Sequence, residues 1–292
     1  MKVTITNGTL TAVLDTMGGQ LTSLKDAQGM EYLWQGDPAY WSGQAPVLFP
    51  IVGALRDGKA LIGGKEYAIK RHGVARSREF TLLESGTDFA VYSLAADEGT
   101  KASYPFAFEL RIAYRLSGHG LLTEYQIYNR GDTPMPFVVG GHPAFRCPLE
   151  EGERFEDYVL EFEQPETADC PVVDLSTGML DFGETDRMLE NSAVLPLEHN
   201  LFYQDALVFY GLKSHCVKLY NPVSGRGVSM DFSGFPFLAA WSAVNDAPFV
   251  ALEPWTGCAT CFDEDNVLEH KRGMRILPPG EAFRVGYVVN VL

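Results

Sequence analysis

The run FAFELRIAYRL at residues 106–116 decides the fold class of this 292-residue chain. Each even-numbered position in the run carries an apolar side chain, whereas Glu109, Arg111 and Arg115 lie between them. Successive side chains of a β-strand point to opposite faces of a sheet, so this run has one apolar and one polar face. The alternation predicts a strand of an antiparallel sheet that covers a core on one side and meets water on the other.

Shorter alternating runs occur along the rest of the chain, at residues 3–5, 89–94, 125–128, 158–162, 217–220 and 283–291. Turn-forming pairs such as Asn7-Gly8 and Pro279-Gly280 separate them, and no long stretch has helical periodicity. This pattern predicts an all-β protein, a large β-sandwich or barrel. Because no linker, repeat or low-complexity tract interrupts it, one domain is expected over residues 1–292. The acidic stretch 150–166 also alternates and is expected to be an edge strand.

The charge balance and the cysteines narrow the classes of partner. The chain has 23 Lys and Arg against 38 Asp and Glu, a net charge of −15, which argues against nucleic-acid binding. No apolar run approaches the roughly 20 residues of a membrane span, and no signal peptide opens the sequence, so a cytoplasmic protein without a membrane partner is expected. The five cysteines are interpreted as reduced thiols. Cys258 and Cys261 form a C-x-x-C, but no second pair or histidine spacing completes a metal site, so they are read as incidental.

Four segments embed ionisable side chains among Gly, Pro and aromatic residues, at 46–58, 71–76, 140–145 and 252–257. Taken singly, a His beside Gly is usually a turn residue and a Glu before Pro is usually solvated. Together they are more informative, because two of the six histidines, His72 and His142, fall in these segments. Glu253 is followed closely by Trp255, and a flat apolar ring beside polar groups suits the face of a sugar. The four segments predict one polar pocket.

These segments, in this order, resemble the aldose 1-epimerase (mutarotase) family, and within it the branch of LacX-like proteins and hexose-6-phosphate mutarotases. The resemblance covers nearly the whole chain. It implies a galactose mutarotase-like β-supersandwich, a single domain whose concave sheet face holds one monosaccharide or monosaccharide phosphate. It also implies neither a metal nor an organic cofactor. Whether the protein is a monomer or a homodimer stays open.

The family chemistry assigns roles to four residues. Interconversion of the α and β anomers requires a base that takes the proton of the C1 hydroxyl and an acid that protonates the ring oxygen. By resemblance Glu253 is the base and His142 the acid, expected on opposite sides of the C1–O5 bond. His72 is expected to contact the ring oxygen or a neighbouring hydroxyl group, and Arg56 to bind sugar hydroxyl groups.

Other positions keep two interpretations. Asp205 is the best candidate for a carboxylate that holds sugar hydroxyl groups, or it is a turn residue. Trp255 is expected beside the sugar, and Trp41 either there or in the core. Arg76 belongs to a basic cluster at residues 70–78 and either binds a sugar phosphate or pairs with a carboxylate.

Three alternatives to a mutarotase of free aldohexoses therefore remain. One is a hexose-6-phosphate 1-epimerase, in which Arg56 and Arg76 bind the phosphate. The second is a sugar-binding or sensing protein without turnover. The third, a polysaccharide-cleaving enzyme, lacks support from a second domain or extra aromatic platforms.

Overall fold

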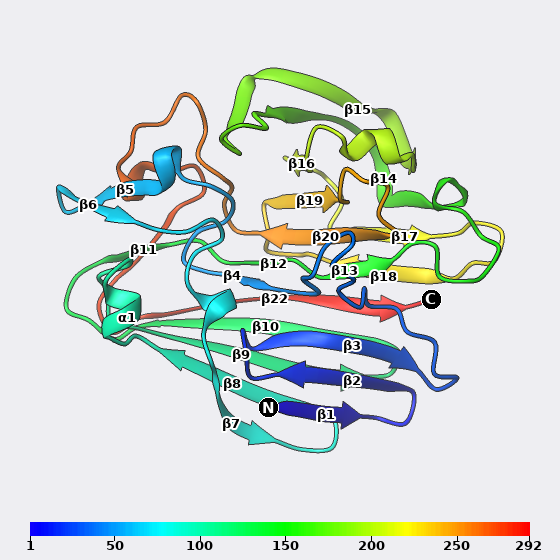
Figure 1. The fold of residues 1–292 in the computed structure, drawn as a ribbon, viewed down its shortest axis with the longest axis horizontal. Helices are drawn as coiled ribbons and strands as arrows, with labels where there is room; N and C mark the ends of the chain where they lie inside the picture. Colours follow the sequence, from blue (N-terminus) through cyan, green and yellow to red (C-terminus); the bar gives the residue numbers. More distant parts are fainter.

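The largest sheet of the computed structural model, which describes residues 1–292, has nine strands with every neighbouring pair antiparallel. In spatial order they are β15 (Leu180–Pro196), β14 (Val159–Val173), β17 (Cys216–Tyr220), β18 (Gly227–Asp231), β22 (Ala282–Val291), β10 (Gly120–Asn129), β9 (Phe108–Ser117), β8 (Phe89–Ala95) and β7 (Thr81–Ser85). The C-terminal strand β22 therefore lies in the interior of this sheet (Figure 1).

A second, six-stranded sheet provides the strands around the site described below. Its order is β16 (Leu207–Tyr210), β19 (Phe237–Trp241), β20 (Phe249–Trp255), β12 (Gly140–Gly141) and β4 (Val47–Leu48), and β13 (Ala144–Arg146) also pairs with β20. All seven residues of β20 are buried. The long strand β14 packs against β16, and β15 arches above them (Figure 1).

The remaining elements are short. Three strands form an N-terminal sheet, β1 (Lys2–Thr6), β2 (Leu10–Asp15) and β3 (Gln20–Asp26). There are two two-stranded sheets: β5 (Lys59–Ile62) and β6 (Lys65–Ala68) form a hairpin, and β11 (Met135–Phe137) pairs with the distant β21 (Arg275–Leu277). The one α-helix is α1 (Glu98–Lys101), and single 3-10 turns occur at Arg56–Gly58, Ala75–Ser77, Phe155–Asp157, His199–Phe202 and Leu268–His270. No helix has the length and apolar character needed to cross a membrane.

The two large sheets face each other across one core. Within β9 the buried residues are the even-numbered ones, and Ile112 pairs with Tyr125 of β10. Gly141 of β12 comes close to that layer, because a Cβ on it would lie within about 3 Å of the Tyr125 and Tyr287 hydroxyl groups. The backbone of β12 therefore lies directly on the side chains of the nine-stranded sheet, which brings His142 close to the core.

The predicted all-β fold is confirmed, and the run at 106–116 forms β9 with the expected buried face. The expectation of an edge strand within residues 150–166 was wrong. The strand there, β14, pairs with β15 on one side and with β17 on the other, so the edge of the sheet is β15. Two of its carboxylates have partners on neighbouring segments: Glu161 contacts Lys218 of β17, and the buried Glu166 accepts from the hydroxyl group of Ser214.

Candidate functional site

A cavity of about 290 Å³ lies on the six-stranded sheet, near the lower end of the range of roughly 300–1,000 Å³ for small-molecule sites. Strands β19 and β20 supply part of its wall, and the ends of β14 and β15 close another side. Six of the residues expected from the sequence line it: His72, Arg76, His142, Asp205, Glu253 and Trp255. Segments that are far apart in the chain thus meet at one place.

The centre of the cavity is a buried carboxyl–imidazole pair. Glu253 lies on β20, and His142 directly follows β12, which pairs with β20. Glu253 Oε1 and His142 Nε2 are 3.3 Å apart. The second carboxyl oxygen of Glu253 and Nδ1 of His142 are buried without a hydrogen-bond partner in the protein. The pair is therefore in direct contact, although the two groups were expected on opposite sides of a sugar bond.

Burial disfavours the charged form of both groups. It raises the pKa of the Glu253 carboxyl well above the usual value, and the negative charge of Asp205 adds to this increase. Burial also lowers the pKa of the His142 imidazole to about 3, and the positive charges of Arg76 and Arg71 add to this decrease. Between these two pKa values the pair holds one proton. In the resting site that proton favours Glu253, and a transfer across the 3.3 Å contact gives carboxylate and imidazolium.

The first two segments hold His72 through the backbone. The ring Nδ1 of His72 accepts a hydrogen bond from the backbone N–H of Gly53 at 3.2 Å, and the backbone N–H of His72 donates to the Gly53 carbonyl group at 2.9 Å. A nitrogen that accepts carries no proton, so neutral His72 has its proton on Nε2. Burial lowers the pKa of His72 well below its usual value, which keeps the ring neutral. His72 thus has one fixed donor atom, and its positive φ of 67° is a strained conformation of the kind found at functional sites.

Three tryptophans surround the pair. Trp41 stacks on the His142 ring with centroids 4.8 Å apart, and Trp241 meets the same ring edge-on at 5.4 Å. Trp255 also lines the cavity, and its indole N–H is buried without a hydrogen-bond partner. Trp41 lines the cavity and is only partly buried, and it also packs against the buried Phe249 of a small core cluster, so both of its sequence interpretations stay open. Flat apolar walls around a few unpaired polar atoms suit a small ligand that has an apolar face as well as hydroxyl groups.

The polar side of the cavity has positively and negatively charged side chains. Arg71 Nη2 lies 3.3 Å from Asp205 Oδ2, an ion pair that joins the second segment to the turn before β16. Asp205 has a positive φ of 74° and is mostly buried. Arg76 lines the cavity without an ion pair, so the sequence alternative in which it pairs with a carboxylate does not describe this structure. One free guanidinium therefore faces the ligand space.

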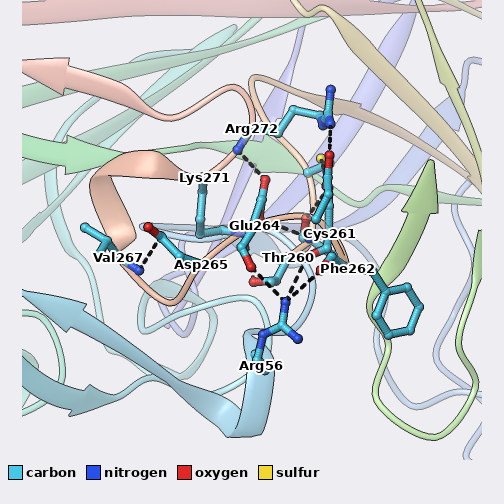
Figure 2. A network of polar contacts seen from close by, with 12 residues as sticks. Arg56, Thr260, Cys261, Phe262, Glu264, Asp265, Val267, Lys271 and Arg272 are labelled. Atoms are coloured by element: carbon cyan, nitrogen blue, oxygen red, sulfur yellow. Dashed lines mark hydrogen bonds and ion pairs between the residues drawn. The ribbon is translucent and has the colours of Figure 1, made fainter. Parts of the chain in front are cut away.

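Arg56 is the expected site residue that the structure does not bring to the cavity. Its Nη2 donates to the carbonyl groups of Cys261, Phe262 and Glu264 at 3.2, 3.2 and 2.9 Å (Figure 2). The turn at Arg56–Gly58 directs the side chain toward the loop after β20 instead. The observed contacts give Arg56 a role in holding that loop.

Sequence reasoning missed Trp241 as a site residue and noted Arg71 only as part of a basic cluster. Trp241 ends β19, whose antiparallel partner β20 carries Glu253. Pairing the two neighbouring runs at 237–241 and 249–255 in the sequence would have placed Trp241 near Glu253. Nothing local marks the contact of Arg71 with Asp205, because the two residues are 134 positions apart.

Comparisons with known proteins agree with this arrangement. The model of the family described as "Aldose 1-epimerase" matches residues 1–289. The plasmid-encoded protein LacX of Lactococcus lactis subsp. lactis is 42% identical over 298 residues, which cover all of both chains. A galactose mutarotase related enzyme from Lactobacillus acidophilus superposes with a TM-score of 0.95 at 33% identity, covering 100% of this chain and 97% of that one. A galactose mutarotase-like protein from Lactobacillus casei gives a TM-score of 0.92 at 28% identity over the whole of both chains.

The match with the family model extends over nearly the whole length of the chain, and the LacX relative is similar over all of it. The solved structures share the arrangement of strands on which the cavity is built. This chain belongs to the aldose 1-epimerase family.

Proposed function

We propose that this protein is an aldose 1-epimerase that interconverts the α and β anomers of an aldohexose. The observation that carries the proposal is the buried contact between Glu253 and His142 inside a cavity walled by tryptophans. Anomer exchange needs one proton acceptor and one proton donor near a single carbon atom. The two hemiacetal oxygens, O1 and O5, share C1, so a pair 3.3 Å apart can reach both from one side.

The reaction uses one proton on the pair throughout. With carboxylate and imidazolium present, Glu253 takes the proton of the C1 hydroxyl group while His142 gives its proton to O5. The C1–O5 bond breaks and the aldehyde forms. After rotation about C1–C2, His142 takes the O5 proton back as O5 attacks C1, and Glu253 returns a proton to O1. The pair ends as it began, so the cycle consumes no proton.

The surrounding residues orient the sugar. His72 presents its Nε2–H as a donor, which suits the ring oxygen or a neighbouring hydroxyl group. Asp205 can accept hydrogen bonds from sugar hydroxyl groups while Arg71 balances its charge. Trp255 supplies an apolar surface and a free N–H donor. Water exclusion by this environment strengthens each polar contact.

The test is anomer exchange, followed by polarimetry or NMR, on freshly dissolved α-D-glucose and α-D-galactose. Glu253→Gln keeps the shape of the side chain but cannot accept a proton, so kcat is expected to fall by about 10²-fold or more. Sugar affinity, followed by tryptophan fluorescence, is expected to stay within a few-fold. Asp205→Asn is the comparison variant, since a loss of binding groups raises KM more than it lowers kcat.

Two results would contradict the proposal. An unchanged kcat in Glu253→Gln would remove the carboxyl group from the chemical step. A wild-type protein that binds sugar but accelerates neither sugar nor glucose 6-phosphate would be a sugar-binding or sensing protein.

A second candidate, a hexose-6-phosphate 1-epimerase, is favoured by one observation. Arg76 faces the cavity without an ion pair, and Arg71 lies beside it. Guanidinium groups bind phosphate oxygens in a bidentate manner. Arg76→Ala should then lower kcat/KM for glucose 6-phosphate far more than for glucose. The matched control is Arg78→Ala, which removes a nearby guanidinium that pairs with Asp97 and does not line the cavity. An equal loss on both sugars in Arg76→Ala would remove the phosphate role.

A further inference from the structure

Two cysteine sulfurs meet in the loop that follows β20. Sγ of Cys258 and Sγ of Cys261 are 3.9 Å apart, and both thiols are free and buried. A disulfide bond is about 2.05 Å long, so the sulfurs have to approach by about 2 Å to bond. The other three cysteines are also free, and no second sulfur lies within hydrogen-bonding distance of any of them. The C-x-x-C motif is therefore a dithiol.

The surroundings of the two thiols contain charges of both signs and are unequal. Lys271 is buried, and its Nζ donates to Thr260 Oγ1 at 2.9 Å. The contact with Cys258 lowers the pKa of the Cys261 thiol, and Arg272 adds to this decrease, while burial and the carboxylate of Glu264 oppose it. The same contact raises the pKa of Cys258. Positive neighbours favour the thiolate, which is the reactive form of cysteine. Cys261 is thus suited to attack an oxidant and Cys258 to resolve the product.

The same loop forms part of the cavity wall. Ala259, between the two cysteines, lines the cavity. The Thr260 N–H donates to the Ala54 carbonyl group at 3.0 Å, and the Thr260 carbonyl group accepts from the Leu180 N–H at 3.0 Å. Leu180 also lines the cavity. A movement of this loop is therefore transmitted to two sides of the ligand space.

Hydrogen bonds made by charged side chains hold the loop in its present position. Glu264 accepts from the Cys261 N–H at 3.0 Å and from Lys271, while Arg56 donates to the carbonyl groups of Cys261 and Glu264 (Figure 2). The loop is thus held firmly on one side of the dithiol. Because that side is held, we expect closure of the 3.9 Å gap between the two sulfurs to displace the part between them, which contains Ala259.

We propose that Cys258 and Cys261 form a redox-active dithiol that hydrogen peroxide oxidises to a disulfide, and that this disulfide lowers the activity of the neighbouring cavity. The buried sulfurs require an oxidant of this small size. The Cys261 thiolate attacks one peroxide oxygen, the O–O bond breaks, and water and a sulfenic acid form. Cys258 then attacks that sulfur, the S–O bond breaks, and a second water leaves. Two thiols and one peroxide give one disulfide and two waters, and an external dithiol reverses the change.

The effect on the cavity rests on the proposed function, whereas disulfide formation does not. The full-length protein is treated with hydrogen peroxide and then with dithiothreitol, and three quantities are followed: intact mass, sugar affinity by tryptophan fluorescence, and anomer exchange. The expected mass change is the loss of two hydrogens, with peptides joined at Cys258 and Cys261. Because small displacements at an active site have large effects on rate, kcat/KM is expected to fall on the order of tenfold and to recover on reduction.

Matched variants separate this dithiol from the other thiols. Cys258→Ser and Cys261→Ser should each abolish both the mass change and the reversible loss, whereas Cys216→Ser, at a half-buried thiol outside the loop, should keep both. Sulfinic or sulfonic acids as the only products, or a disulfide that leaves both sugar affinity and kcat/KM unchanged, would overturn the proposal. A protein that forms the disulfide and changes sugar affinity, but never exchanges anomers, would contradict the proposed function alone.

Discussion

Gly53 is the position at which the structure allows the sharpest quantitative prediction. Its φ is +65°, and a Cβ added there would lie 2.4 Å from the Cβ of Ala259. A left-handed conformation costs a residue with a Cβ about 1–2 kcal/mol. Forcing a methyl group into a packed site costs typically about 1–3 kcal/mol. Gly53→Ala should therefore lower the free energy of unfolding by about 2–5 kcal/mol.

Gly58 is the matched control in the same segment. Its φ is +68°, and an added Cβ would meet no atom within 4 Å. Gly58→Ala should therefore show only the conformational cost of about 1–2 kcal/mol. The difference between the two variants, measured by urea denaturation, isolates the clash with Ala259.

The Gly53 variant should also affect the site, because the Gly53 N–H holds Nδ1 of His72. We expect the histidine NMR signals to show a loss of the single Nε2–H tautomer in Gly53→Ala and not in Gly58→Ala. Equal destabilisation of the two variants, together with an unchanged His72 tautomer, would refute this account of the Gly53 contacts.

Three further predictions concern the Glu253–His142 pair, the buried hydroxyl group of Thr256 and the side chain of Arg56. Since the pair holds one proton between the two pKa values, kcat/KM should stay level as the pH falls through 6.5 and decrease only toward the lowered pKa of His142, about 3. At high pH, kcat/KM should decrease as Glu253 loses its proton. A decrease of kcat/KM on the acidic side near pH 6.5 would contradict this prediction. Thr256→Val removes a buried hydroxyl group that accepts from the Val139 N–H at 2.9 Å, so thermal or urea unfolding should show a loss of about 1–3 kcal/mol. Arg56→Ala should lower the free energy of unfolding by about 1–3 kcal/mol while KM stays within a few-fold, and a large rise in KM would return Arg56 to the sugar site.

The sequence was a good guide to the strands and to the segments of the site. Alternation reports which face of a strand is buried, so the run at 106–116 identified β9 correctly. It does not report which strands become neighbours, and for this reason β14 was expected at the edge of the sheet although it pairs on both sides.

The limits at the site have the same origin. His72, His142 and Glu253 stood out because Gly, Pro or aromatic residues flank them, and all three line one cavity. The direction of a long flexible side chain depends on tertiary contacts instead. Arg56 therefore points to carbonyl groups of a loop more than 200 positions away, and the direct contact between Glu253 and His142 depends on the pairing of β12 with β20.

The place of β22 in the nine-stranded sheet affects how the protein is made. This strand lies between β18 and β10, yet the ribosome synthesises it after every other strand of that sheet. Until β22 emerges, β10 and β18 each present an open edge, and exposed edges of this kind promote aggregation. The two halves of the sheet can join only after β22 has been synthesised. We therefore expect ribosome-bound chains that lack β22 to be recognised by chaperones.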